Sequence, residues 1–85
     1  MATIEIILNG EAKVIKTQTT MIELIKDLEL VPERLAVEYN LKILKRNRWN
    51  DIYLAEGDQI EIVQLVGGGW ESEKLLIIKK IRIGI

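Results

Sequence analysis

The sequence lacks cysteine and histidine and has a single proline among its 85 residues. Without cysteine, no disulfide can support the small fold, which suits a reducing compartment. Without cysteine and histidine, the chain cannot form a Cys–His or Ser–His catalytic pair, and a zinc site would need carboxylates alone. These absences exclude most hydrolase and metalloprotein classes. We therefore expect a protein that is not an enzyme and that binds no metal or cofactor of its own.

The chain also lacks an excess of one charge and a long apolar run. Its 12 basic and 13 acidic side chains give a net charge of −1, so it has no global field that would hold a phosphate backbone or an anionic lipid. Its longest apolar runs, such as Leu75-Leu76-Ile77-Ile78, are far shorter than the roughly 18 residues of a membrane span. The N-terminus has no signal-peptide pattern. These features predict a cytoplasmic protein with neither nucleic acid nor membrane as a partner.

What the sequence does contain is enough for one small domain, with 48% hydrophobic and 29% charged residues. The chain divides at Gly67-Gly68-Gly69, because three glycines have no side chains to pack and a high backbone entropy. Residues 1–69 carry a net charge of −3, whereas residues 70–85 carry a net charge of +2. We predict a folded domain over residues 1–69 and an apolar, β-prone extension over residues 70–85.

The domain begins with the pattern of a β-hairpin. Residues 3–8 and 11–16 are β-prone and flank Asn9-Gly10, a dipeptide suited to the positive φ angles of a type I′ turn. Further strands are expected at residues 35–39, 41–44, 52–54 and 59–66, the last of which is the most strongly β-patterned run in the chain. Between the last two strands, Glu56-Gly57-Asp58 has the composition of a tight turn rather than of a catalytic carboxylate pair.

One helix is expected over about residues 20–29. Thr20 and Glu23 have the spacing of a capping box at its start. Pro32 disfavours helical geometry at Val31 and so helps to end it. The apolar stripe that we assign to the core consists of Ile22, Ile25 and Leu28.

The order of hairpin, helix, strands and a long last strand indicates an α+β domain with one helix on one face of a mixed sheet. This order fits the β-grasp, or ubiquitin-like, topology, in which the last strand pairs parallel with the first and the helix supplies the crossover. The glycines would then project from the edge of the sheet. A backbone carboxylate at the end of such a glycine tail can thread a narrow channel in a partner, but it needs activation, most simply as an acyl-adenylate made by another enzyme.

Three further features have a structural interpretation that we favour over a functional one. Trp49 and Tyr53 are expected to pack in the core or at the sheet edge, because the chain has few aromatic residues. The basic side chains of Lys42, Lys45, Arg46 and Arg48 fit a solvated loop as well as they fit an acidic partner. If the domain has a partner-binding surface, we expect it on the exposed face of the sheet.

The ordered set of motifs in the second half of the chain is distinctive. It consists of Asn40, Arg46, Trp49, Gly57-Asp58, Ile60-Glu61-Ile62-Val63 and Gly67-Gly68-Gly69. With this set, the chain resembles the ThiS family, the bacterial sulfur carrier proteins of thiamin biosynthesis, over residues 1–69. The small subunit of molybdopterin synthase, another β-grasp carrier, is the nearest alternative, and an unmodified β-grasp interaction module is a third.

The resemblance implies a specific chemistry for the last glycine. An E1-like adenylyltransferase would use ATP and Mg²⁺ to adenylate the carboxylate of Gly69. A sulfurtransferase or cysteine desulfurase, working through a persulfide, would convert it to a thiocarboxylate, and thiazole synthase would consume the sulfur. Gly67 and Gly68 would be the flexible approach to Gly69, and no side chain of the carrier would be catalytic.

The chain departs from the family pattern in three places. Leu41 stands where the family often has glycine, and Lys45 where it often has proline. The third departure is the extension over residues 70–85, which places the carboxylate of Gly69 in a peptide bond. Cleavage after Gly69, fusion to a downstream partner, and a frameshift or artefact are three explanations. An uncleaved extension is expected to pair with an exposed edge strand, within one molecule or between two copies as an oligomer.

Overall fold

The computed structural model describes residues 2–65 and 78–80 of the chain. Within them, α1 (Met21–Asp27) is accompanied by two 3₁₀ turns, η1 (Pro32–Arg34) and η2 (Arg46–Arg48). The strands of the described residues are β1 (Thr3–Leu8), β2 (Glu11–Lys16), β3 (Leu35–Tyr39), β4 (Lys42–Leu44), β5 (Gln59–Leu65) and β6 (Ile78–Lys80). None of the helices in this described part combines the length and the apolar character needed to cross a membrane.

The first two strands form the expected hairpin. β1 and β2 pair antiparallel, with Leu8 opposite Glu11 at the turn. Asn9 and Gly10 have φ angles of 50° and 85°, as the two central residues of a type I′ turn require. The hairpin prediction is therefore confirmed in both its bounds and its turn.

The start of α1 is the predicted capping box. The Glu23 backbone N–H donates to the Thr20 hydroxyl oxygen at 3.3 Å, and the Thr20 backbone N–H donates to the Glu23 carboxylate at 2.9 Å. Both partners thus satisfy backbone donors that the first turn of a helix leaves without intrahelical acceptors.

The helix ends at Asp27, slightly before the predicted end at about residue 29. Glu29 has a φ of 61°, and its backbone N–H donates to the Lys26 carbonyl at 2.9 Å, while the Leu30 N–H donates to the Ile25 carbonyl at 3.4 Å. These two bonds form a Schellman motif, which closes the helix with a left-handed residue. Pro32 lies beyond this motif, after an extended Val31 with φ −90° and ψ 109°.

The buried stripe of α1 also differs from the prediction. Met21, Leu24 and Ile25 are the buried helix residues, whereas Ile22 and Leu28 are only partly buried against the core. Assigning Ile22 and Leu28 wholly to the core was wrong, because the helix is short and presents the stripe containing Met21 and Leu24 to the sheet.

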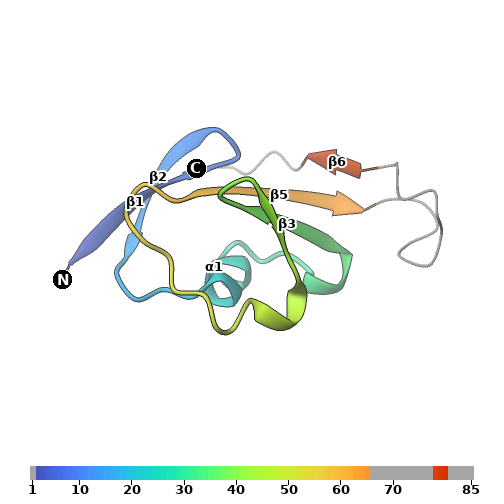
Figure 1. Ribbon diagram of the computed structural model, residues 1–85, viewed down its shortest axis with the longest axis horizontal. Coiled ribbons are helices and arrows are strands. Elements are labelled where there is room, and N and C mark those ends of the chain that lie inside the picture. Colours follow the sequence, from blue (N-terminus) through green and yellow to red (C-terminus); the bar gives the residue numbers. More distant parts are fainter. Residues whose placement is uncertain (1, 66–77, 81–85) are drawn as a thin grey trace.

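β5 lies at the centre of the mixed sheet. Among the described residues the strand order is β2-β1-β5-β3-β4, and β6 pairs with β5 outside this sequence. β1 and β5 are parallel, with Ile7 opposite Gln59 and Leu8 opposite Ile60, and β3 runs antiparallel to β5 on its other side (Figure 1). The first and last strands of the domain are therefore neighbours, which confirms the β-grasp topology.

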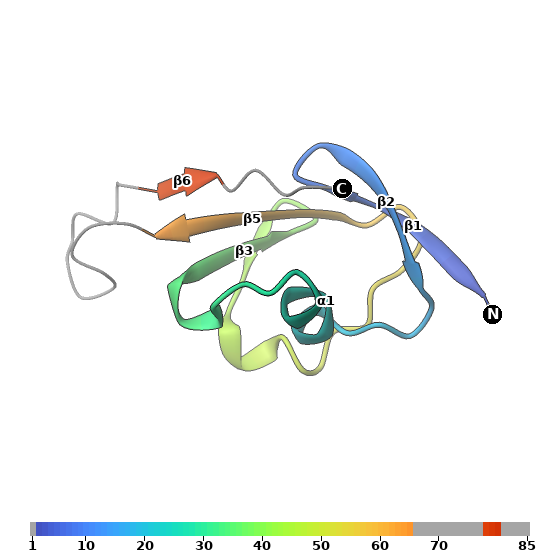
Figure 2. The same cartoon turned by 180° about the vertical axis from the view of Figure 1, so that it is seen from behind.

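The core lies between the sheet and the helix, which covers one face (Figure 2). Its buried apolar residues are Ile6, Leu8, Met21, Leu24, Ile25, Leu35, Val37, Trp49, Leu54, Ile60 and Ile62. The strand expected over residues 52–54 is absent from the described residues, where only a single bridge joins Tyr53 to Thr20. This segment instead follows the helix start, to which it is tied by the Met21 N–H donating to the Ile52 carbonyl at 2.9 Å.

Part of the extension joins the sheet. Ile78–Lys80 pairs antiparallel with the end of β5, with Leu65 opposite Ile78 and Val63 opposite Lys80. The extension thus forms a strand pair within one molecule, but its partner is the end of the central strand β5 and not the edge strand that was predicted. Because Gly67, Gly68 and Gly69 lie outside the described residues, the division of the chain after Gly69 stays a prediction.

Candidate functional site

The candidate site is the end of β5, which leads directly into the three glycines. Ile60 and Ile62 are fully buried in the core, so this strand is anchored by its inward-facing side chains. Gly67, Gly68 and Gly69, the predicted site residues, lie outside the described residues. What the structure describes is the strand that precedes them in the sequence.

Asn9 holds β5 from the turn of the first hairpin. Its backbone N–H donates to the Ile60 carbonyl at 2.8 Å. Its side-chain oxygen accepts from the Ile62 N–H at 2.8 Å, and its side-chain nitrogen donates to the Ile62 carbonyl at 3.2 Å. The amide of one side chain thus continues the sheet ladder where the backbone of β1 turns away. Sequence reasoning identified Asn9 only as a turn residue and missed this second role.

A second asparagine holds the start of β5 on the opposite side. The Asn40 N–H donates to the Gln59 carbonyl, and the Asn40 side-chain oxygen accepts from the Gln59 N–H, both at 2.8 Å. The Asn40 side-chain nitrogen donates to one oxygen of Asp58 at 3.1 Å. Asn40 is one of the motif residues, and the structure explains it as a ladder residue rather than as a reactive one.

Asp58 is likewise occupied by structural hydrogen bonds. Besides the bond from Asn40, its second oxygen accepts from the Ala55 N–H and from the Tyr39 hydroxyl, both at 2.8 Å. The Asp58 N–H also donates to the Ala55 carbonyl at 3.0 Å, closing a turn in which Gly57 has a φ of 85°. The interpretation of this segment as a tight turn is confirmed.

The same contacts perturb Tyr39. Partial burial, followed by its hydrogen bond to Asp58 and the negative charge of that carboxylate, raises the pKa of the Tyr39 hydroxyl to about 12. All three effects disfavour the phenolate. Tyr39 therefore acts as a hydrogen-bond donor over the physiological pH range, not as a base.

Trp49 and Tyr53 have different environments. Trp49 is 2% exposed, and its indole N–H donates to the Leu44 carbonyl at 3.0 Å, which confirms the packing interpretation for this motif residue. Tyr53 is 63% exposed, so the expectation that it packs was wrong. Its backbone forms the isolated bridge to Thr20.

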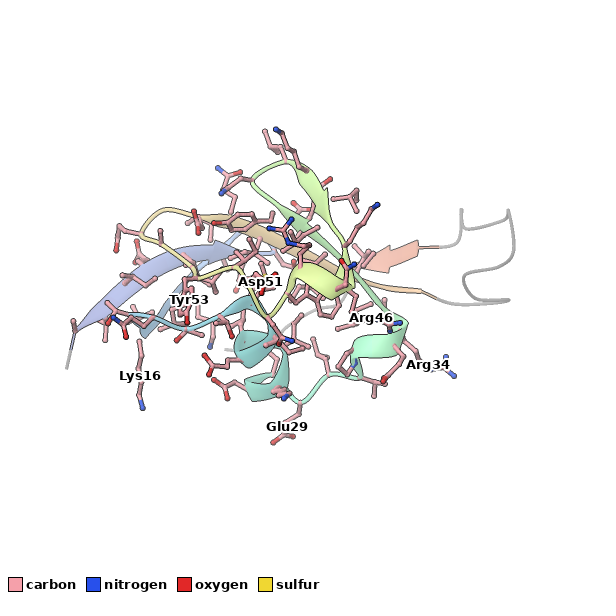
Figure 3. All side chains as sticks on the ribbon, turned by 60° about the horizontal axis from the view of Figure 1, so that its bottom comes forward. Lys16, Glu29, Arg34, Arg46, Asp51 and Tyr53 are labelled. Atoms are coloured by element: carbon pink, nitrogen blue, oxygen red, sulfur yellow. The ribbon has the colours of Figure 1, made fainter. Side chains whose placement is uncertain are left out.

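The basic side chains of η2 and its neighbours are exposed to solvent. Lys42, Lys45, Arg46 and Arg48 all belong to exposed residues, and Arg48 pairs with Asp51 at 3.5 Å on the surface. Figure 3 shows Arg34 from η1 at the same end of the molecule as Arg46. This exposure agrees with the solvated-loop interpretation.

The outer face of the sheet is a mixture of apolar and acidic residues. A shallow cavity of about 190 Å³ is lined by Ala36, Val37, Glu38, Ile43, Glu61 and Val63. Ile43 is 70% exposed there. No cluster of three or more potential metal ligands occurs in the described ranges, 2–65 and 78–80. The prediction of a partner surface on this face stays a prediction.

Comparison with known proteins identifies the family. The family model described as ThiS family matches residues 4–69, which is most of the chain and ends at the last of the three glycines. The chain belongs to the ThiS family. This ThiS-family chain is also 36% identical over 63 residues to the sulfur carrier protein ThiS of Bacillus subtilis, an alignment that covers 73% of this chain and 96% of that one.

A solved ThiS-family structure supports the fold. The crystal structure of the thiamine biosynthesis protein ThiS from Geobacter metallireducens superposes with a TM-score of 0.67 at 25% identity. The match covers 78% of this chain and 100% of the Geobacter chain. The β-grasp fold described above is therefore also the fold of a ThiS-family structure, and the match includes that whole chain.

A longer relative includes a ThiS-like segment. A thiazole synthase of Magnetococcus marinus is 40% identical over 62 residues, which are 73% of this ThiS-family chain but 19% of that protein. The chain thus spans about a fifth of the length of this relative. A segment similar to this ThiS-family chain is thus part of a longer polypeptide that is named thiazole synthase.

Proposed function

We propose that this domain is a sulfur carrier whose terminal carboxylate, at Gly69, is adenylated, converted to a thiocarboxylate and used for thiazole formation in thiamin biosynthesis. The observation that carries the proposal is the family match, which ends at residue 69. The structure adds support because β5, anchored by the buried Ile60 and Ile62, ends at Leu65, shortly before Gly69 in the sequence.

The proposed chemistry uses a main-chain group and reagents from partners. A carboxylate oxygen of Gly69 attacks the α-phosphate of ATP and displaces pyrophosphate, which gives an acyl-adenylate; Mg²⁺ in the activating enzyme balances the phosphate charge. The terminal sulfur of a partner's cysteine persulfide then attacks the acyl carbon, and AMP leaves. A second thiol reduces the resulting acyl disulfide, so the carrier keeps one sulfur as a thiocarboxylate and the two thiols form a disulfide.

The residues of the chain fit a carrier that supplies no catalytic side chain. The 85 residues contain no cysteine that could form the persulfide. The acidic group most suggestive of a site, Asp58, has both oxygens engaged by neighbouring donors. We therefore assign adenylation to an E1-like adenylyltransferase and persulfide delivery to a sulfurtransferase or cysteine desulfurase.

Thiazole synthase is the acceptor that we propose for the sulfur. The Magnetococcus marinus protein named thiazole synthase includes a segment similar to this domain. Carrier and synthase in one polypeptide would be held at a high effective concentration, which suits a reaction that passes sulfur from one to the other. Fusion to such a partner also remains one explanation for residues 70–85.

The proposal requires a free carboxylate on Gly69. In the sequence, Gly69 is followed by Trp70, so its carbonyl belongs to a peptide bond. The extension must therefore be cleaved after Gly69 before adenylation. Intact-mass measurement of protein from its native host tests this requirement. We expect a chain ending at Gly69, with a fraction heavier by the replacement of one oxygen with sulfur. A uniform full-length mass would instead favour an unmodified β-grasp interaction module.

A reconstituted reaction gives a second test. The activating enzyme and ATP are offered a chain ending at Gly69 or the full chain, and pyrophosphate release is measured. Only the shorter chain should be adenylated, and equal adenylation of both would overturn our account of the terminus. Rescue of growth by thiamin rather than by molybdenum cofactor in a host lacking the protein would distinguish the thiazole role from that of a molybdopterin synthase subunit.

A further inference from the structure

Basic side chains gather in one part of the domain. Residues 34–48 carry five basic side chains and one acidic side chain, whereas the rest of residues 1–69 carries three basic and ten acidic side chains. The two parts therefore have net charges of +4 and −7. The five basic residues of the first part are all exposed, and they are Arg34, Lys42, Lys45, Arg46 and Arg48. A basic surface on an otherwise acidic domain attracts and orients a partner of negative charge.

The fold places part of this charge beside an apolar groove. The groove has a volume of about 250 Å³ where β3, β4 and η2 meet, and Lys45 and Arg46 form its basic rim. The rest of its lining is apolar and includes Ile43, Leu44 and Trp49. The Trp49 indole N–H donates to the Leu44 carbonyl at 3.0 Å, which ties η2 to β4. The groove is thus formed by packed elements of the fold, and it combines an apolar lining with two cations.

The carboxylates of the domain leave this rim charge uncompensated. Arg48 is paired with Asp51 at 3.5 Å. Across residues 2–65 and 78–80, by contrast, Lys42, Lys45 and Arg46 form no ion pair. Ile43, which is 70% exposed, lies in the same groove as Lys45 and Arg46. Exposed apolar surface and cations are therefore available together to another molecule.

We propose that this groove is a docking site for an acidic segment of a partner protein. The segment would place an apolar side chain against Ile43 and carboxylates against Lys45 and Arg46. A single-stranded nucleic acid is also negative, but its bases bind by stacking on exposed aromatic side chains. Trp49 in the groove is 2% exposed, and Figure 3 shows the exposed Tyr53 away from Arg46. The groove therefore fits an acidic protein segment better than a nucleic acid.

The groove adjoins the strand that precedes the glycines. Leu35 and Ala36, which line the groove, lie opposite Gln64 and Val63 near the end of β5. A partner that binds the residues after this strand would meet the groove beside it. The acidic segment is then expected on the protein that receives the terminal carboxylate, and this one step rests on the proposed function.

Fluorescence anisotropy with the full chain tests the site. The probe is a labelled synthetic peptide in which leucines alternate with glutamates. One control peptide has glutamine in place of glutamate, and the other has serine in place of leucine. We expect micromolar binding of the probe, weakened by salt, and at least about tenfold weaker binding of each control peptide. No binding of the probe, or equal binding of either control peptide, would overturn the proposal.

Two charge reversals locate the binding surface. Arg46→Glu alters the rim of the groove, and Lys16→Glu is the matched control, because Lys16 is equally exposed and lies at the other end of the domain (Figure 3). Arg46→Glu should weaken probe binding at least about tenfold, and Lys16→Glu less than about threefold. Ile43→Ser, at an exposed position, should also weaken it at least about threefold. Equal losses from the two reversals would show that net charge alone attracts the peptide and would refute a docking groove.

Two other occupants would give different results. An oligouridylate that binds more tightly than the probe and displaces it would assign the surface to single-stranded nucleic acid. A salt-sensitive dimer in sedimentation velocity that Arg46→Glu disrupts would assign it to a second copy of this chain. Either result would overturn the proposal. None of these measurements involves Gly69 or sulfur, so failure of the carrier function would leave them unaffected, and adenylation of Gly69 could proceed without the groove.

Discussion

At the scale of single residues, the side-chain amides of two asparagines form hydrogen bonds to β5 that the backbone of a neighbouring strand usually forms. Asn9 and Asn40 both have positive φ angles, of 50° and 51°, and both direct their side-chain amides at β5. Asparagine tolerates this conformation better than most residues and adds an amide that can imitate a peptide group. The sequence predicted the turn at Asn9 from the Asn9-Gly10 dipeptide, but composition does not reveal which distant strand either amide bonds to.

Leu41 is less suited to its conformation. It follows Asn40 in the turn between β3 and β4, has a φ of 73°, and is 81% exposed. A Cβ atom in the left-handed region costs roughly 1–2 kcal/mol, and an exposed leucine recovers little of this through packing. Leu41→Gly is therefore expected to raise the free energy of unfolding by about 1 kcal/mol, measured by urea denaturation. Leu41→Ala keeps the Cβ atom and should give no such gain, and an equal gain from both variants would refute the backbone explanation.

Tyr39 predicts a dependence of stability on alkaline pH. In the unfolded chain its hydroxyl ionises near the ordinary pKa of 10.0, whereas in the folded chain the pKa is raised to about 12. Between these values the unfolded state binds fewer protons, so the contribution of Tyr39 is complete below pH 10 and is lost as the pH rises to about 12. Urea denaturation across this range should show a steeper loss of stability in the parent protein than in Tyr39→Phe.

A direct titration provides the control. Tyr39 and Tyr53 are the two tyrosines of the chain, so Tyr53→Phe leaves Tyr39 as the single phenol to follow by ultraviolet absorbance. The Tyr53 side chain is 63% exposed, so this background should fold normally. A pKa of Tyr39 at its ordinary value in that background would contradict the effect of burial and of Asp58.

At the scale of secondary structure elements, the sequence predicted the strand and helix bounds that are set by residues close to them in the chain. The bounds of β1, β2 and β3 follow from β-prone runs and turn residues, and the capping box locates the start of α1. The end of α1 was misplaced because Glu29, which no propensity marks as a left-handed residue, closes a Schellman motif. The expected strand around Tyr53 was wrong because its segment pairs with the helix start instead of joining the sheet.

The capping box gives a prediction for α1 as a unit. The helix is seven residues long, so a single lost cap removes a large share of its end stabilisation. Thr20→Ala removes the hydroxyl that accepts from the Glu23 N–H, and we expect the free energy of unfolding to fall by about 1 kcal/mol. Thr20→Ser keeps the hydroxyl and should lose less. Equal losses in the two variants, measured by urea denaturation, would point to the buried methyl group instead of the cap.

At the scale of the whole molecule, the sequence predicted the fold through the order of its elements. A hairpin, a helix and a final strand restrict the first and last strands to a parallel pairing, which the structure shows. The candidate site was predictable only in part, because a terminal carboxylate leaves no cluster of side chains to recognise. Its identification depended on motif residues such as Asn40 and Trp49, which the structure explains as parts of the fold that supports β5.

The extension should be dispensable for folding, although β6 joins the sheet. Among the residues whose burial the structure describes, the buried apolar side chains of the core lie between Ile6 and Ile62, and β6 adds a three-residue ladder at the end of β5. A chain ending at Gly69 therefore loses a few ladder hydrogen bonds, each worth about 1 kcal/mol net, and its free energy of unfolding should fall by no more than about 2 kcal/mol. Urea denaturation followed by circular dichroism checks this value. A chain ending at Ile60, which lacks the fully buried Ile62, is the contrasting case and should not fold cooperatively. Loss of the fold on removal of residues 70–85 alone would show that β6 is part of the domain and would contradict the division of the chain after Gly69.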